Sequence, residues 1–111
     1  MKKLLLHTAL LIAFLSFIGC GNSTPDESDA KEAARAAVLQ NLKSPSGAKF
    51  HQNETVKDLG DNTFEYVETV EATNSFGGTI AQNATAKIKW NGGDPSEVQN
   101  WSVIDVQFVD R

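Results

Sequence analysis

The chain has 111 residues, of which 41% are hydrophobic, with 10 basic and 14 acidic side chains and a single cysteine. This length fits one domain at most. The net charge of -4, together with the lack of any cluster of Lys and Arg, argues against a protein that binds nucleic acid through its phosphates. The single cysteine excludes an intramolecular disulfide, a Cys-based zinc site and an iron–sulfur cluster.

The beginning of the chain predicts an export signal. Two lysines follow the initial methionine, and residues 4–18 are then almost entirely apolar, a run too short for a comfortable membrane span. This run leads into Phe17-Ile18-Gly19-Cys20, which resembles the lipobox of bacterial lipoprotein precursors. The resemblance implies cleavage before Cys20 and attachment of fatty acyl chains, such as palmitate, to this residue. Two or more such chains anchor a protein stably in a membrane.

We therefore expect a lipoprotein signal peptide over residues 1–19, a lipidated cysteine with a short tether over 20–24, and a single domain over 25–111. The alternatives are a plain signal peptide cleaved elsewhere and an uncleaved anchor. Gly21, and not Asp, follows the cysteine, which in sorting of the enterobacterial kind implies the outer membrane. Cleavage removes two lysines and leaves 8 basic and 14 acidic side chains, a net charge of -6.

One helix is predicted after the tether. Thr24 is the expected N-cap, Pro25 the first helical residue, and Glu27 completes a capping box. Because Pro disfavours helical geometry in the residue before it, Pro45 is expected to end the helix. A thin apolar stripe with three- and four-residue spacing predicts that the helix lies flat on a sheet, and it comprises Ala30, Ala33, Ala34, Ala37, Val38 and Leu42.

The remainder of the chain alternates between β-rich segments and turns. In the last segment the apolar residues change face between Val103 and Ile104, which predicts a β-bulge or a strand covered on both faces. The order of the segments predicts an α+β fold, with one N-terminal helix packed on a four-stranded antiparallel meander sheet. The four expected strands cover residues 48–59, 63–73, 79–90 and 101–109.

Three short segments together resemble a small uncharacterised domain that recurs in bacterial and phage lipoproteins. These segments are residues 42–50, residues 74–78 and Trp101-Ser102-Val103, and the resemblance covers roughly residues 29–109. It implies a fold and an exposed position at the cell surface, and it supplies no catalytic residue. Since some phage-encoded lipoproteins of this size block superinfection, a prophage origin and a role of that kind form one hypothesis.

The candidate catalytic side chains favour structural interpretations. His51 is the only histidine outside the expected signal, no Gly-x-Ser-x-Gly motif accompanies it, and we expect it to be a partly exposed strand residue. If neighbouring aromatic residues face the core, Glu68 points inward, but we expect an edge position or a bulge to turn it outward. The acidic turns do not follow calcium-loop spacing. We therefore expect no catalytic residue, no metal and no cofactor, and a protein that is not an enzyme.

Aromatic residues at the turns are the candidate binding surface. Phe76 lies beside Ser75 in a turn, where it either folds back as a plug of the core, which we expect, or projects as a binding anchor. Trp90 and Trp101 are expected to pair across neighbouring strands and to be core by default, although exposed tryptophans would mark an interface. The first hypothesis is therefore a protein-interaction module that contacts an envelope or extracellular protein.

An inhibitor of a basic cell-wall lytic enzyme, such as lysozyme, is the second hypothesis. The segment Ser46-Gly47-Ala48-Lys49-Phe50 is similar to the Ser-Gly-x-x-Tyr motif of membrane-bound lysozyme inhibitors, with Phe in place of Tyr and with a position before the first strand. The acidic charge of the mature chain would steer it towards a basic enzyme.

Overall fold

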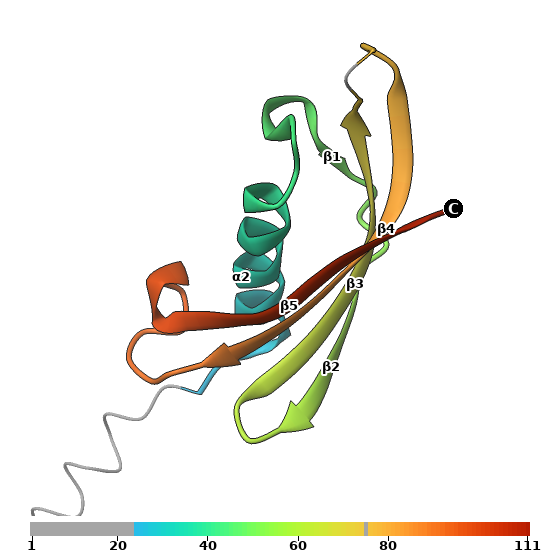
Figure 1. The fold of residues 1–111 in the computed structure, drawn as a ribbon. Helices are drawn as coiled ribbons and strands as arrows, with labels where there is room; N and C mark the ends of the chain where they lie inside the picture. The colour runs from blue at the N-terminus through green and yellow to red at the C-terminus, as the bar shows by residue number, and fades with distance from the viewer. Residues whose placement is uncertain (1–23, 75) are drawn as a thin grey trace, which may run out of the picture.

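The computed structural model describes residues 24–74 and 76–111, so the predictions for the signal peptide, for Cys20 and for Ser75 lie outside the described residues. Within the described residues, one α-helix is followed by an antiparallel sheet, which confirms the α+β class (Figure 1). None of the described helices is long and apolar enough to cross a membrane. The elements are α2 (Glu27–Gln40), the 3₁₀ helix η1 (Pro45–Gly47), β1 (Lys49–Phe50), β2 (Thr55–Gly60), β3 (Thr63–Thr73), β4 (Thr79–Trp90), the 3₁₀ helix η2 (Val98–Asn100) and β5 (Trp101–Asp110).

The sheet has five strands where four were predicted. Its order is β1-β3-β4-β5, and β2 also pairs with β3. β1 and β2 lie along the same edge of β3 at different heights, since Phe50 is opposite Val70 and Val56 is opposite Tyr66. The single strand predicted at 48–59 is thus split in two. At the split, Gln52 adopts a left-handed backbone with a φ of 61°, which interrupts the strand.

Helix α2 begins two residues later than predicted. The N-cap is Asp26, whose carboxylate accepts a hydrogen bond from the Asp29 amide at 2.9 Å, and Asp29 accepts one from the Asp26 amide at 3.1 Å. These two residues form the capping box that was expected at Thr24 and Glu27. The hydrogen bond from the Asp29 amide also holds the pKa of the Asp26 carboxyl below its ordinary value. A carboxylate directly before the helix therefore replaces the threonine as the cap.

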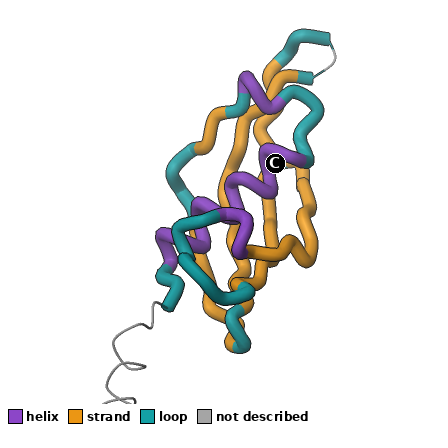
Figure 2. Tube along the Cα trace, turned by 90° about the vertical axis from the view of Figure 1, so that its left-hand side faces the viewer, coloured by secondary structure: helices purple, strands orange, loops and turns teal. Residues whose placement is uncertain are grey.

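The core lies between α2 and one face of the sheet (Figure 2). The buried part of α2 consists of five of the six residues of the predicted stripe, Ala30, Ala33, Ala34, Ala37 and Val38. The helix ends at Gln40 and not at Pro45 as predicted, so the sixth residue, Leu42, follows the helix. Short alanine side chains let the helix lie close to the sheet. The opposite wall is formed by alternate residues of β3 and β4, namely Phe64, Tyr66, Val70, Ala84, Ala86 and Ile88.

Strand β5 contains the predicted bulge. Lys87 lies opposite Asp105, but the next residue, Ile88, lies opposite Val103, so Ile104 is the extra residue. The bulge turns Val103 onto the face that carries Ile88. It accounts for the change of face in the sequence pattern of this strand.

Candidate functional site

A buried carboxylate lies at the centre of the interface between α2 and the sheet. Glu68 of β3 is 1% exposed and points towards the helix, so the prediction that it turns outward was wrong. The guanidinium of Arg35 on α2 binds both of its oxygens, with Nε 2.9 Å from Oε1 and Nη2 2.7 Å from Oε2. This two-point contact neutralises the charge of Glu68 and makes its burial tolerable.

Two further hydrogen bonds satisfy the Glu68 carboxylate. The hydroxyl of Tyr66 donates to Oε1, and the amide of Gln52 donates to Oε2 at 2.9 Å. Burial opposes ionisation of Glu68, but the hydrogen bonds from Arg35, Tyr66 and Gln52 outweigh it and hold its pKa below the ordinary value. Burial and the contact with Glu68 raise the pKa of Tyr66. Glu68 is therefore a fixed internal charge that neither accepts nor releases a proton near neutral pH.

The split edge of the sheet completes this cluster. Gln52, whose backbone is left-handed, donates the hydrogen bond from its amide to the Glu68 carboxylate. The same residue offers its side-chain oxygen to Nη2 of Arg35 at 3.2 Å, and Glu54 forms an ion pair with that nitrogen at 3.2 Å. The ring of Phe50 faces the guanidinium, with 4.9 Å between its centroid and the Arg35 carbon. The break between β1 and β2 thus serves to hold Arg35 and Glu68.

His51 lies in the break between β1 and β2, and not within a strand as predicted. Its amide donates to the carbonyl of Thr69 at 3.0 Å, and its Nε2 lies 3.0 Å from Oε2 of Glu71. Both side chains are about one third exposed, 34% and 35%. Over residues 24–74 and 76–111, no three His, Cys, Asp or Glu side chains gather in a way that could hold a metal ion.

The two tryptophans occupy different environments. They lie directly opposite each other on β4 and β5, which confirms the predicted pairing. Trp101 is 8% exposed, packs against Phe64 with 5.7 Å between ring centroids, and donates from Nε1 to the carbonyl of Pro95 at 2.9 Å. Trp90 is half-buried, and its Nε1 is buried without a hydrogen-bond partner. Trp101 therefore belongs to the core and not to a binding surface.

Phe76 projects from the tip of the hairpin between β3 and β4. Its side chain is 94% exposed, so the prediction that it plugs the core was wrong. The reason is geometric, because this hairpin extends past the end of α2 and has no core beneath its tip (Figure 1). The side chain of Asn74 fixes the turn, since its Oδ1 accepts hydrogen bonds from the amides of Phe76 at 3.0 Å and Gly78 at 2.9 Å. Gly77 supplies the positive φ of 83° that the turn needs.

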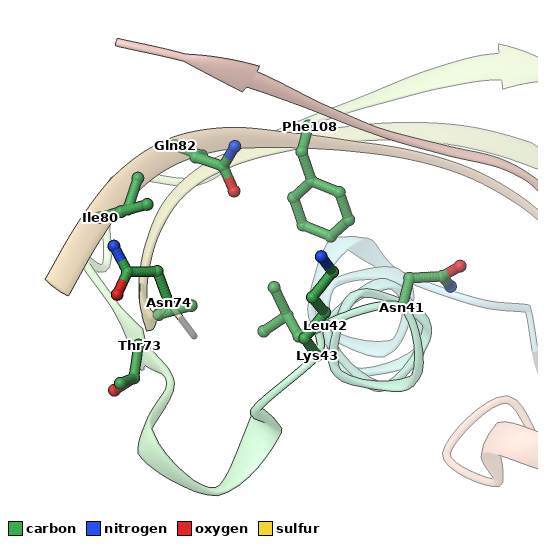
Figure 3. A pocket seen from close by; sticks show the side chains of 9 residues that line it. Asn41, Leu42, Lys43, Thr73, Asn74, Ile80, Gln82 and Phe108 are labelled. Atoms are coloured by element: carbon green, nitrogen blue, oxygen red, sulfur yellow. The ribbon is translucent and has the colours of Figure 1, made fainter. Parts of the chain in front are cut away.

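A pocket of about 310 Å³ opens between the distal end of this hairpin, next to its turn, and the end of α2. We name it the hairpin pocket. Leu42, Ile80 and Phe108 supply its apolar part, and they approach it from three different segments (Figure 3). Ile80 remains 40% exposed although it faces the same side of the sheet as the core. The remaining lining residues are Asn41, Lys43, Ala72, Thr73, Asn74 and Gln82.

Comparisons of the chain with protein-family models, with curated proteins and with solved structures return no match. The resemblances to lipoproteins described in the sequence stay predictions. The candidate site therefore rests on its own geometry, which combines an exposed aromatic residue on a hydrogen-bonded turn with an apolar pocket beside it.

Proposed function

We propose that this protein is a non-catalytic, lipid-anchored component of the bacterial envelope, a binding module that holds a protein partner at the membrane surface. The observation that carries the proposal is the exposure of Phe76, 94% of whose side chain faces solvent. Placing a phenyl ring in water forfeits the free energy that its burial would release. A partner that covers the ring recovers that free energy.

The turn presents Phe76 as an anchor at low entropic cost. Four hydrogen bonds of Asn74 hold the backbone around Phe76. Its side chain accepts two, its amide donates one to the Gly78 carbonyl at 2.8 Å, and its carbonyl accepts one from the Gly77 amide at 3.1 Å. An aromatic residue on a preorganised loop is typical of the residues that dominate interface energies. The hairpin pocket lies on the same hairpin and offers a place for an apolar side chain of the same partner.

The non-catalytic part of the proposal is supported by the positions and contacts of the titratable groups. The oxygens of Glu68 are occupied by Arg35, Tyr66 and the Gln52 amide. His51 contacts Glu71, and neither of them lines the hairpin pocket. A general acid–base mechanism needs a titratable group within reach of a bound substrate. The hairpin pocket is lined by amides, a hydroxyl and a lysine, with no carboxylate or imidazole among them.

The lipid anchor is supported by the apolar run that ends in Phe17-Ile18-Gly19-Cys20. Growth of expressing bacteria with labelled palmitate tests it. We expect label on the wild-type chain and recovery in the membrane fraction, of the outer membrane in a Gram-negative host. The variant Cys20→Ser should carry no label. Equal labelling of both proteins, or an unlabelled wild type, would contradict lipidation at Cys20.

Chemical crosslinking in intact cells, followed by purification of the tagged full chain, tests the partner. We expect one crosslinked protein that is lost in Phe76→Ala. Leu59→Ala is the matched control, because Leu59 is also an exposed apolar residue, at 42%, but lies at the end of β2 in the turn to β3. A partner that is retained in Phe76→Ala and lost in Leu59→Ala would place the binding surface elsewhere.

Inhibition of a basic cell-wall lytic enzyme is the second candidate function, and the net charge of -6 expected for the mature chain favours it. The purified protein should then inhibit lysozyme, with an association rate that falls steeply as salt is added. A superinfection-exclusion role is a special case of the first candidate. It predicts that cells expressing the wild type, but not Cys20→Ser, resist phage infection.

A further inference from the structure

The two edges of the sheet differ in how they are protected against pairing with another strand. One edge consists of two short strands, β1 and β2, separated by the left-handed residue Gln52. Lys49 and Lys57 lie on these strands. Short strands, breaks and lysines are the features that block edge-to-edge association. This edge is therefore unsuited to accept a further strand.

The other edge is formed by β5, and no other described strand pairs with its outer side. β5 is ten residues long and contains no proline, glycine or lysine. Three of its large apolar residues are exposed: Val103 at 49%, Ile104 at 52% and Val109 at 57%. A long and partly apolar strand with unpaired backbone groups is a template for β-pairing.

The bulge at Ile104 limits regular pairing to the later part of β5. From Asp105 to Asp110 the strand follows β4 without a register shift. Within this stretch side chains alternate strictly between the two faces of the sheet, and Phe108 shares the face of α2 because it lies opposite the buried Ala84. Residues 105–110, with Arg111 directly after the end of β5, are thus the segment that an added strand can match.

We propose that residues 105–111 pair antiparallel with the same residues of a second copy of this chain, in a register centred on Phe108. This register places Asp105 opposite Arg111 of the second copy, and by symmetry it does so twice. It also places Val106 opposite Asp110, Gln107 opposite Val109, and Phe108 opposite itself. Opposite charges and aromatic residues that face each other across strands are stabilising pairs.

Other two-fold registers that keep both α2 helices on one face of the joined sheet match these charges less well. A register centred on Asp105 brings two like charges directly opposite each other, which is destabilising. A register centred on Gln107 leaves Asp105 opposite Val109 and Arg111 opposite Val103, so it pairs no acid with a base. Of these, only pairing about Phe108 joins each acid at position 105 to a base. Charge complementarity therefore selects a second copy, in this register, as the occupant of the edge.

Charge reversal followed by mixing tests this interface. In Asp105→Arg the introduced arginine faces Arg111 of the second copy, and in Arg111→Asp the introduced aspartate faces Asp105. We expect the full-length wild type in detergent to sediment as a concentration-dependent dimer. The dimer of each variant alone should be weaker by a factor of about ten or more, because two attractive pairs become repulsive. An equimolar mixture should regain the dimer, since both cross-chain pairs are again of opposite charge.

The mixing step separates the interface from effects on folding. Asp105 also lies opposite Lys87 within the chain, so its substitution can weaken the monomer, but mixing cannot repair such damage. Ser102→Arg is the matched control on β5 outside the paired segment, and it should leave the dimer intact. A wild type that stays monomeric at every concentration would overturn the proposal, as would a mixture that fails to restore the dimer. Because Phe76 lies outside β5, Phe76→Ala should lose the envelope partner and keep the dimer.

Discussion

The hairpin of β3 and β4 has two halves that differ in nearly every property except their backbone pairing. The covered half, residues 64–70 and 84–88, lies under α2, and its buried charge and hydroxyl groups all have partners. The distal half, residues 71–82, extends past the helix and carries the exposed Phe76 in its turn (Figure 1). The register between the strands continues without a shift through both halves. This difference shows that coverage by the helix, and not the strand pairing, determines which residues of the hairpin are buried and which are exposed.

The largest effect on stability is expected from removing the counter-ion of the buried carboxylate in the covered half. Arg35→Ala would leave the Glu68 carboxylate buried without its counter-ion. We expect a loss of about 3–5 kcal/mol in the free energy of unfolding, measured by denaturant titration. The double variant Arg35→Met with Glu68→Leu removes both charges and should recover most of that loss. A loss below about 1 kcal/mol in Arg35→Ala would show that water reaches Glu68 in the folded protein.

Acid should weaken the same half of the hairpin. The pKa of Glu68 is lower in the folded protein than its ordinary value of 4.5. The stabilisation that this difference provides is complete above the ordinary value and is lost as the pH falls through the folded pKa. We expect the free energy of unfolding to fall steeply below pH 4.5, and to fall less steeply in Glu68→Gln. Asp26 and Asp94 also have lowered pKa values, so some slope should remain in the variant. Parallel curves for the two proteins would contradict a depressed pKa at Glu68.

A smaller effect is expected at the turn of the distal half. Asn74→Ala removes the two hydrogen bonds that the Asn74 side chain accepts from the amides of Phe76 and Gly78. We expect a loss of about 1 kcal/mol in unfolding free energy, because these bonds are exposed to solvent. Amide exchange at the turn should rise while exchange in the covered half stays slow. Asn74→Asp is the control, since a carboxylate can accept the same two bonds.

The smallest effect on stability is expected from Phe76→Ala. Because 94% of the side chain is already in solvent, its removal should change the unfolding free energy by less than about 0.5 kcal/mol. The same substitution is expected to abolish binding of the envelope partner. A clearly destabilised variant would mean that the ring contacts the domain in solution, and the contrast between the two halves of the hairpin would then disappear.

Much of the fold could be predicted from the sequence, because its signals are local. The predicted bounds of β3 and β4 are confirmed, because turn-forming residues border each of these strands at both ends. The alanine stripe of α2 is also confirmed, because it follows the helical periodicity of the apolar residues. The bulge of β5 is confirmed as well, because it shows in the sequence as a break in the strand alternation. Local patterns of this kind survive folding when the tertiary contacts agree with them.

The parts that were not predicted depend on residues distant in sequence. Glu68 is buried because Arg35, 33 positions earlier, meets it, and no local pattern of β3 contains that information. An arginine beside the apolar stripe of the helix and a glutamate on the inner face of a strand were the two available signals, and only their combination points to a buried pair. Phe76 was misplaced for a related reason. Whether a turn lies over a core depends on where the helix ends, which the turn itself does not encode.

The contact of Glu68 with two segments outside its own strand has a consequence for how the molecule opens. Arg35 comes from the helix, Gln52 from the split edge, and Tyr66 from β3 itself. Releasing the helix or the split edge alone takes hydrogen-bond partners from a carboxylate that the remaining structure still buries, so partial openings are disfavoured. Hydrogen exchange at the Gln52 amide should therefore require global unfolding, although that residue is itself exposed and sits at an interrupted strand. An irregular edge, which usually exchanges first, is here coupled to the slowest-exchanging core.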